Sequence, residues 1–305
     1  MIYNFILIIY MDNTQFNLNN IILDDQDKKC SPTSIFEFGS CLTIEALIEM
    51  IKAYNKEHSN DTIQEHSNLN TLNPSKYKIY LLEELSKKTK NECTNQKCWT
   101  TQSFMKHLNN IMREQIIKFT WRTDGPQGRF DWLSTYNVNG VMEQTEKKYT
   151  EFKFLGAVPM DFDNLPETNI PNLNIDKYIK NNKNKFGIIF NLDESWKSGS
   201  HWVSFFSDIN NGSIYYFDSY GIRPEPRVRK LMRKFYNYCT EHNINAVSDY
   251  NKIRHQYGGS ECGVYSINFI KRLLKGHTFQ DICQSKVKDI KINKCRKVYF
   301  GNTDF

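Results

Sequence analysis

Four residues with catalytic chemistry follow one another in the second half of the chain: His201, Asp218, Gln256 and Cys262. A cysteine attacks as its thiolate, so a nucleophilic Cys262 needs a nearby imidazole to take its proton, and His201 can supply one. The second imidazole nitrogen needs a hydrogen-bond acceptor that orients the ring, which Asp218 can provide. The amide of Gln256 and the backbone N–H of Cys262 can donate to the oxyanion of a tetrahedral intermediate. The residue types and their order predict a cysteine peptidase that works by acyl transfer.

The residues around these four positions carry a family resemblance. Trp202 follows His201 directly, and Gln256 stands six residues before Cys262 in Gln-Tyr-Gly-Gly-Ser-Glu-Cys-Gly. This pattern resembles the adenain and Ulp1 clan of cysteine proteases, whose signature is His-Trp, then Asp or Asn, then Gln-x5-Cys-Gly. Papain-like proteases have the order Gln, Cys, His, Asn, so the chain order separates the two groups.

Segments outside the signature narrow the resemblance. They are Gly-Pro at 125–126, Trp-Leu-Ser-Thr-Tyr-Asn-Val at 132–138 and Asn-Leu-Asp at 191–193. They are similar to segments of the maturation proteases of large cytoplasmic DNA viruses, a group that includes the polyprotein-processing protease of African swine fever virus. One departure is Glu261, which precedes the nucleophile where the wider clan often has Asp.

The resemblance implies a viral endopeptidase that cleaves structural or core polyprotein precursors at Gly-Gly-x sites during virion maturation. A narrow channel would explain that preference, and Trp132, Asn137 and Trp202 are the candidates to line it as substrate-binding residues. The expected location is the host cytoplasm, at the viral factory, and the virion. The mechanism requires no metal and no organic cofactor.

Two other functions stay open. A ubiquitin- or SUMO-like deconjugating protease shares the catalytic design and the Gly-Gly preference, so ubiquitin-like proteins are a second class of partner besides polyprotein or core-protein substrates. A non-catalytic virion or nucleic-acid-binding protein on a protease fold is disfavoured, because such a protein does not need all four groups. The basic stretch 227–234 allows nucleic acid as a weak accessory partner, although a solvated helix face is the commoner meaning of such a pattern.

The composition is that of a folded protein. With 305 residues, of which 39% are hydrophobic and 14% aromatic, the chain can form one large domain or a catalytic domain with a smaller one. The net charge of +6 is mild, and Lys and Arg are scattered. The first ten residues are apolar but too short to span a bilayer, so no membrane span is expected. Because Met11 follows them, residues 1–11 are interpreted as an upstream extension.

The eight cysteines are expected to be free thiols in a reducing cytoplasm. Cys93 and Cys98 are spaced like a metal-binding pair, but His107 alone does not complete a four-ligand zinc site. Cys283 and Cys295 are interpreted as structural. His255 is expected to face outwards or to support its loop, because neighbouring residues of an extended segment point in opposite directions.

Hydrophobic periodicity predicts a helical N-terminal arm at 12–112 and a protease core at 113–305. The fold class is α+β, with a small, mostly antiparallel sheet packed on a central helix that carries Cys262 at its N-terminus. A helix N-terminus stabilises a thiolate and supplies N–H groups to an oxyanion. In the arm we expect helices at 44–51, 77–85 and 104–119, with a loop at 55–75. In the core we expect strands at 151–158, 185–191, 201–207 and 213–218, and helices at 138–149, 224–242 and 262–274.

Overall fold

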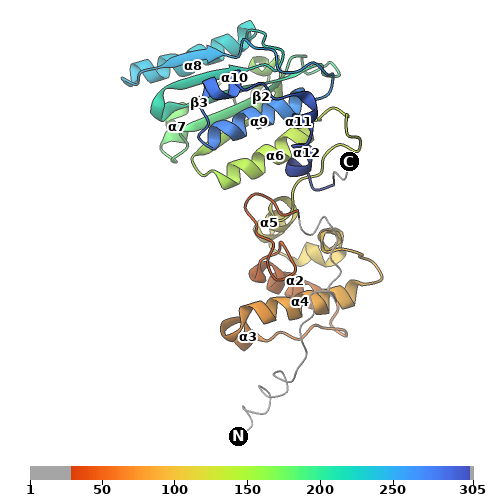
Figure 1. Cartoon of the computed structure of the whole chain (residues 1–305). Coiled ribbons are helices and arrows are strands. Elements are labelled where there is room, and N and C mark those ends of the chain that lie inside the picture. The colour runs from red at the N-terminus through yellow and green to blue at the C-terminus, as the bar shows by residue number, and fades with distance from the viewer. Residues whose placement is uncertain (1–28, 303–305) are drawn as a thin grey trace. The chain divides into compact units, whose positions relative to one another are not determined.

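The computed structural model describes residues 29–302. Contacts divide the chain into two compact units, one ending at Trp121 and the other beginning at Arg122 (Figure 1). The sequence places the end of the arm at 112, but α5 (Asn110–Phe119) belongs to the first unit because Ile116 and Trp121 lie in its core. The expectation that residues 1–11 are an upstream extension lies outside the described residues.

The first unit is helical, as the periodicity of its sequence predicts. Its core is formed by apolar residues of α2 and α4, with contributions from the short 3-10 helices that follow. The expected helix at 104–119 is broken: a 3-10 helix ends at His107, and the side chain of Asn109 accepts a hydrogen bond from Met112 N as the N-cap of α5. The elements are α2 (Ile44–Glu57), α3 (Ser67–Leu72), α4 (Pro74–Thr89), η2 (Gln96–Thr101) and η3 (Ser103–His107), followed by α5.

Four cysteines of the first unit form disulfides, so the prediction of free thiols is wrong for them. Cys30 bonds to Cys41 and Cys93 to Cys98, with Cα–Cα distances of 5.4 and 5.5 Å. The expectation rested on compartment and chain length, neither of which reports the distance between two side chains. No cluster of metal-binding side chains occurs among residues 29–302.

The second unit is built on a five-stranded sheet in the order β1-β2-β3-β4-β5. The α+β class is confirmed, but the sheet is mixed rather than mostly antiparallel: β2–β3 and β3–β4 are antiparallel, whereas β1–β2 and β4–β5 are parallel. The parallel pairs arise because helical crossovers, which contain α7 (Ile175–Ile179) and α8 (Pro226–Glu241), replace tight turns there. The strands are β1 (Phe152–Pro159), β2 (Lys185–Asn191), β3 (Trp202–Asp208), β4 (Ser213–Phe217) and β5 (Val247–Tyr250).

Helices cover both faces of this sheet (Figure 1). On one face lie α6 (Thr135–Lys148) and α9 (Cys262–Leu274), whose bounds confirm the predicted central helix. On the other face α8 buries an apolar stripe that includes Leu231 and Phe235. The remaining helices are α10 (Phe279–Gln284), α11 (Asp289–Asn293) and α12 (Arg296–Tyr299). None of the helices within 29–302 is long and apolar enough to cross a bilayer.

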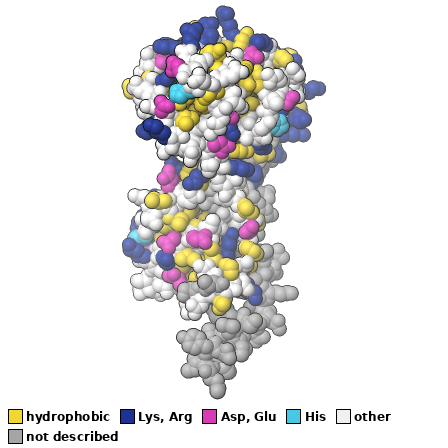
Figure 2. Space-filling view, turned by 90° about the vertical axis from the view of Figure 1, so that its left-hand side faces the viewer, with side chains coloured by type: hydrophobic (Ala, Val, Ile, Leu, Met, Phe, Trp, Pro, Cys, Tyr) yellow, Lys and Arg dark blue, Asp and Glu magenta, His cyan; other side chains and the backbone are white. Residues whose placement is uncertain are grey.

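The basic residues of α8 lie on its exposed side. Arg229, Lys230, Arg233 and Lys234 are exposed, and Figure 2 shows Lys and Arg side chains gathered at the end of the unit where α8 lies. This is the arrangement of an amphipathic helix with a solvated face. Nucleic acid as a partner stays a prediction.

The hairpin between β3 and β4 depends on one glycine. Gly212 has a φ of +69°, and a Cβ at this position would collide with the carbonyl oxygen of Asn245. Gly212→Ala should therefore lower the free energy of unfolding by more than about 2 kcal/mol, the sum of left-handed strain and overpacking.

Gly276→Ala is the matched control for this change. Gly276 has a φ of +87°, but no atom lies within 4 Å of the position that an added methyl group would take, so only the strain of about 1 kcal/mol should appear. Denaturant unfolding of both variants measures the difference. Equal losses would show that the contact with Asn245 is unimportant.

Candidate active site

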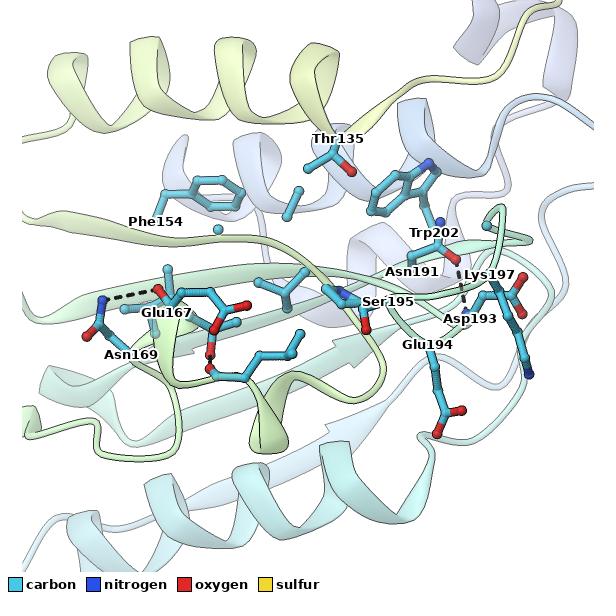
Figure 3. Close-up of a pocket in the computed structure, with 18 of the residues that line it drawn as sticks. Thr135, Phe154, Glu167, Asn169, Asn191, Asp193, Glu194, Ser195, Lys197 and Trp202 are labelled. Carbon is cyan, nitrogen blue, oxygen red and sulfur yellow. Dashed lines mark hydrogen bonds between the residues drawn. The ribbon is translucent and has the colours of Figure 1, made fainter.

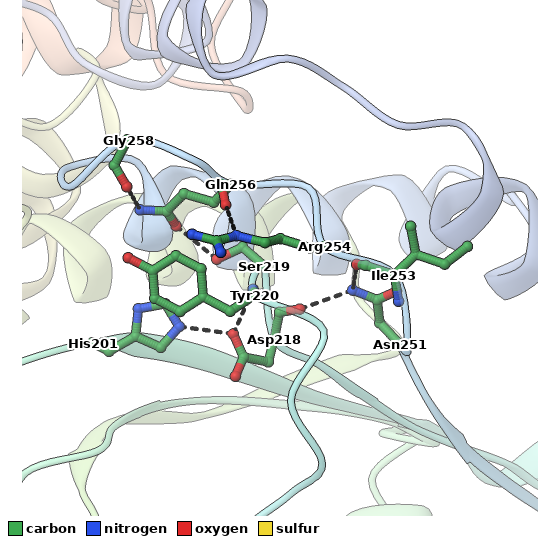
Figure 4. A network of polar contacts seen from close by, with 9 residues as sticks. All are labelled: His201, Asp218, Ser219, Tyr220, Asn251, Ile253, Arg254, Gln256 and Gly258. Atoms are coloured by element: carbon green, nitrogen blue, oxygen red, sulfur yellow. Dashed lines mark hydrogen bonds and ion pairs between the residues drawn. The ribbon is translucent and has the colours of Figure 1, made fainter.

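The sheet brings His201 and Asp218 together because of where they stand in the chain. His201 directly precedes β3 and Asp218 directly follows β4, and these strands are antiparallel neighbours in which Ser204 pairs with Phe217. His201 Nε2 lies 2.8 Å from Asp218 Oδ1 (Figure 4). Both side chains are buried, and Asp218 is 0% exposed. The pair joins two strand ends that are already held in register.

The other nitrogen of His201 is available to Cys262. The His201 side chain hydrogen-bonds Asp218, and interaction with Cys262 also raises the pKa of the imidazole. Since Nε2 meets the carboxylate, Nδ1 is the nitrogen left for the thiol. Cys262 is the first residue of α9 and is buried, so the sulfur lies at the positive end of a helix that stabilises an anion.

His201 is poised to hold a proton. Burial disfavours the imidazolium, but the hydrogen bonds to Asp218 and Cys262 outweigh burial and raise the pKa of His201 to about 9. At neutral pH the ring is therefore charged, and the charge of Cys262 contributes to this preference. The arrangement favours a thiolate–imidazolium pair, the reactive form of a cysteine nucleophile.

Gln256 is held so that its amide nitrogen keeps a free hydrogen. Ser219 Oγ donates to Gln256 Oε1 over 2.7 Å, and Gln256 Nε2 donates to the carbonyl of Gly258 over 2.9 Å (Figure 4). An amide nitrogen carries two hydrogens, so the second is available to an oxyanion. The Ser219 carbonyl also accepts from Gln256 N, which ties the oxyanion segment to the end of β4.

A buried polar network lies beneath the nucleophile. The Glu261 carboxylate accepts from Ser260 N, Ser260 Oγ and Asn293 Nδ2. Arg296 donates to the carbonyl of Ser260 over 3.0 Å. Glu261 thus has a structural role in holding the segment that carries the backbone N–H of Cys262.

The family comparisons agree with this geometry. Residues 181–299 match the family described as Ulp1 protease family, C-terminal catalytic domain. A putative thiol protease of Acanthamoeba polyphaga mimivirus is 38% identical over 273 residues, which cover 87% of this chain and 90% of that protein. The chain belongs to the Ulp1 protease family. It is accordingly a thiol protease, as the order of His201, Asp218, Gln256 and Cys262 predicts.

Two further relatives of this Ulp1-family protease come from African swine fever virus. A SUMO-1 cysteine protease is 25% identical over 234 residues, covering 71% of this chain and 86% of the relative. The crystal structure of the virus's pS273R protease superposes with a TM-score of 0.61 at 22% identity, covering 89% of this chain and 95% of that one. The similarity to the solved structure supports the assignment of the fold.

The three expected substrate-binding residues occupy different environments in this Ulp1-family protease. Trp202 is buried, donates from Nε1 to the Leu133 carbonyl, and is one of the residues that line a pocket of about 710 Å³ beside β1 (Figure 3). Trp132 is 52% exposed and is not among the residues that line this pocket. Its exposed ring is accessible to a substrate, and its role in binding stays a prediction.

Asn137 has a structural position in the cap of α6, and its role in substrate binding stays a prediction. Its Oδ1 accepts from the N and Oγ of Ser134, forming the capping box of α6, and its Nδ2 donates to the carbonyl of Asp124. Both ends of the amide are engaged and the side chain is buried. A capping residue and a channel residue share polar chemistry, so the sequence alone does not separate them.

His255 does not compete with His201 as the base. It is buried, and its Nε2 lies 3.0 Å from the carbonyl of Cys283. Burial lowers its pKa, which keeps the ring neutral. The expectation that it supports its loop agrees with these contacts, whereas the outward-facing alternative is wrong.

Sequence reasoning missed Ser219, which stands directly after Asp218. We expect Ser219→Ala to lower kcat by about fivefold to tenfold, because the loss of one hydrogen bond of about 1 kcal/mol frees the Gln256 amide to rotate.

Gln256→Ala should lower kcat by roughly a hundredfold with little change in KM, since this donor acts on charge that develops in the transition state.

Steady-state kinetics on one peptide, with Ser213→Ala in β4 as a hydroxyl-deletion control, measures both effects. A rise in KM at constant kcat for Gln256→Ala would make this residue a substrate contact. Full activity in Ser219→Ala would exclude a role for the serine in holding the amide.

Asp218→Asn should retain measurable activity, whereas His201→Ala should lose nearly all of it. Asn still accepts from His201 Nε2 but carries no charge, so the pKa of His201 should fall below its value of about 9. The alkaline limb of kcat/KM should therefore move to lower pH, as a titration of activity from pH 5 to 10 would show. An unmoved limb would mean that another group sets it.

Proposed function

We propose that this Ulp1-family protease is a viral endopeptidase that cleaves structural or core polyprotein precursors during virion maturation. The observation that carries the peptidase chemistry is one buried imidazole that hydrogen-bonds Asp218 and interacts with Cys262, the first residue of α9. The viral origin of the similar thiol proteases supports the biological setting. We place the enzyme in the host cytoplasm, at the viral factory, and in the virion.

In the proposed reaction the Cys262 thiolate attacks the substrate carbonyl while His201 holds the proton. Gln256 and the backbone N–H of Cys262 stabilise the oxyanion. The protonated His201 then gives its proton to the leaving amine, and a thioester to Cys262 remains. Water, deprotonated by His201, hydrolyses the thioester and restores the pair.

We propose cleavage after Gly-Gly, with Trp202 beside the substrate's last residues. The indole is fixed by its hydrogen bond to Leu133, and Leu133 also lies within contact distance of a Cβ placed on Gly263. The nucleophile, Leu133 and Trp202 thus form one packed group. A branched side chain next to the scissile bond would have to displace this group, and glycine would not.

Deconjugation of a ubiquitin- or SUMO-like protein is the second candidate function. The swine fever relative bears the description SUMO-1 cysteine protease, and the matching family is named for Ulp1. Incubation with a core polyprotein and with a SUMO conjugate, followed by sequencing of the product ends, separates the two functions. Cleavage of the conjugate alone would favour deconjugation.

Iodoacetamide should label Cys262 first among the four free cysteines. Burial raises the pKa of Cys239 and of Cys295, and raises that of Cys283 to about 12, so their thiolates are scarce at neutral pH. Cys262→Ala should be inactive and folded. Peptide mapping after brief alkylation identifies the labelled residue, and faster labelling of Cys239 would refute the assignment.

A peptide with Gly-Gly before the scissile bond should be cleaved, whereas replacement of the last Gly by Val should reduce kcat/KM by at least about a hundredfold, from steric exclusion at a packed site. The comparison uses two peptides that differ at this position alone. Equal cleavage of both would refute Gly-Gly specificity without touching the cysteine chemistry.

A further inference from the structure

An aromatic ring lies against the catalytic imidazole. The rings of His201 and Tyr220 are stacked, with centroids 4.4 Å apart and planes inclined by 9° (Figure 4). Tyr220 stands two residues after Asp218, and its backbone N donates to Asp218 Oδ1 over 2.8 Å. The oxygen that accepts from His201 therefore also fixes the residue that covers the ring.

A second contact holds Tyr220 from the oxyanion side of the site. The Arg254 guanidinium carbon lies 5.1 Å from the centre of the Tyr220 ring, and Arg254 Nε donates to the Gln256 carbonyl over 2.8 Å. The same guanidinium lies 4.9 Å from the ring centre of Tyr257. The stack thus connects the base to the segment that carries the oxyanion donor.

The chemistry of the contact favours a charged imidazole. The face of an aromatic ring is negative, so it attracts a cation that lies above it. Tyr220 is half-buried, its ring stacks on His201, and its pKa is raised by burial and by the charge of Cys262. The charged groups that bear on His201 and Tyr220 are Asp218, Cys262, Arg254 and Asp289.

We propose that Tyr220 is a positioning residue that holds the His201 imidazolium between Asp218 and Cys262. Its ring face restricts rotation of the imidazole and stabilises the protonated form, and Arg254 keeps the ring in place. The proposal rests on the assignment of His201 and Cys262 as the reactive pair. It requires the aromatic face of Tyr220 and makes no use of the hydroxyl.

The experiment compares Tyr220→Leu, Tyr220→Phe and the wild type in kcat, KM and the alkaline pKa of kcat/KM. Tyr220→Leu should lower kcat about tenfold with KM within twofold, and should move the alkaline pKa down by about half a unit, since 1.36 kcal/mol corresponds to one unit. Tyr220→Phe should behave as wild type. Tyr236→Leu, a matched change on the exposed side of α8, should alter neither quantity.

The proposal would be overturned if Tyr220→Leu kept the wild-type kcat and the wild-type alkaline pKa. It would also be overturned if Tyr220→Phe lowered kcat as much as Tyr220→Leu does. If Tyr220→Leu does not fold, Tyr220→Trp decides the matter: an indole face binds cations more strongly than a phenyl face, so its alkaline pKa should exceed that of Tyr220→Phe. A higher alkaline pKa in Tyr220→Phe than in Tyr220→Trp would refute the proposal.

The outcome for Cys262→Ala separates this inference from the proposed function. If that variant is active, the reactive pair is wrongly assigned and both fail. If Cys262→Ala is inactive while Tyr220→Leu equals the wild type, the cysteine mechanism stands and the positioning role alone is refuted.

Discussion

The hydrogen bond between the buried Asp218 carboxylate and His201 Nε2 is the interaction on which the site depends. A buried carboxylate is costly unless a cation or several donors meet it, and here an imidazolium and the N–H of Tyr220 both meet its Oδ1. This requirement helps to keep His201 charged, so a positive group faces the nucleophilic Cys262. The buried position of Asp218 at the end of β4 thus contributes to the charge that His201 places beside Cys262.

The turn after β4 concentrates several functions in consecutive residues. Asp218 orients the base, Ser219 orients the Gln256 amide, and Tyr220 stacks on the imidazole. The turn is tight: Gly221 N donates to the Asp218 carbonyl, and Gly221 has a φ of +75° with the backbone of Ile253 within 3.1 Å of a Cβ position. One turn of fixed geometry can align a base and an oxyanion donor more accurately than separate loops, and misplacement of reacting groups by about 1 Å can cost a hundredfold in rate.

The parts of the fold that were predicted correctly from the sequence are those whose signal is local. The helix α9 and the strand β2 have the predicted bounds because each shows an uninterrupted apolar pattern of one period. The strand β5 was missed, since its four residues are largely exposed and owe their conformation to pairing with β4. The four catalytic residues could be identified in the sequence from their order. The roles of Ser219, Tyr220 and Arg254 could not, because they arise from contacts between segments distant in the chain. The disulfides of the first unit depend on distances between side chains, which composition does not report.

The two halves of the reactive pair belong to one core, which explains how the geometry is maintained. Cys262 begins α9, and α9 packs on the sheet through a cluster that contains Phe217 and Trp202, the neighbours in sequence of Asp218 and His201. The rings of Phe217 and Phe269 stack with centroids 4.9 Å apart, which joins the strand of the orienting acid to the helix of the nucleophile. Because packed interiors resist small displacements, the separation of sulfur and imidazole is set by the core rather than by the surface loops. The catalytic geometry therefore depends on buried residues of the sheet and of α9.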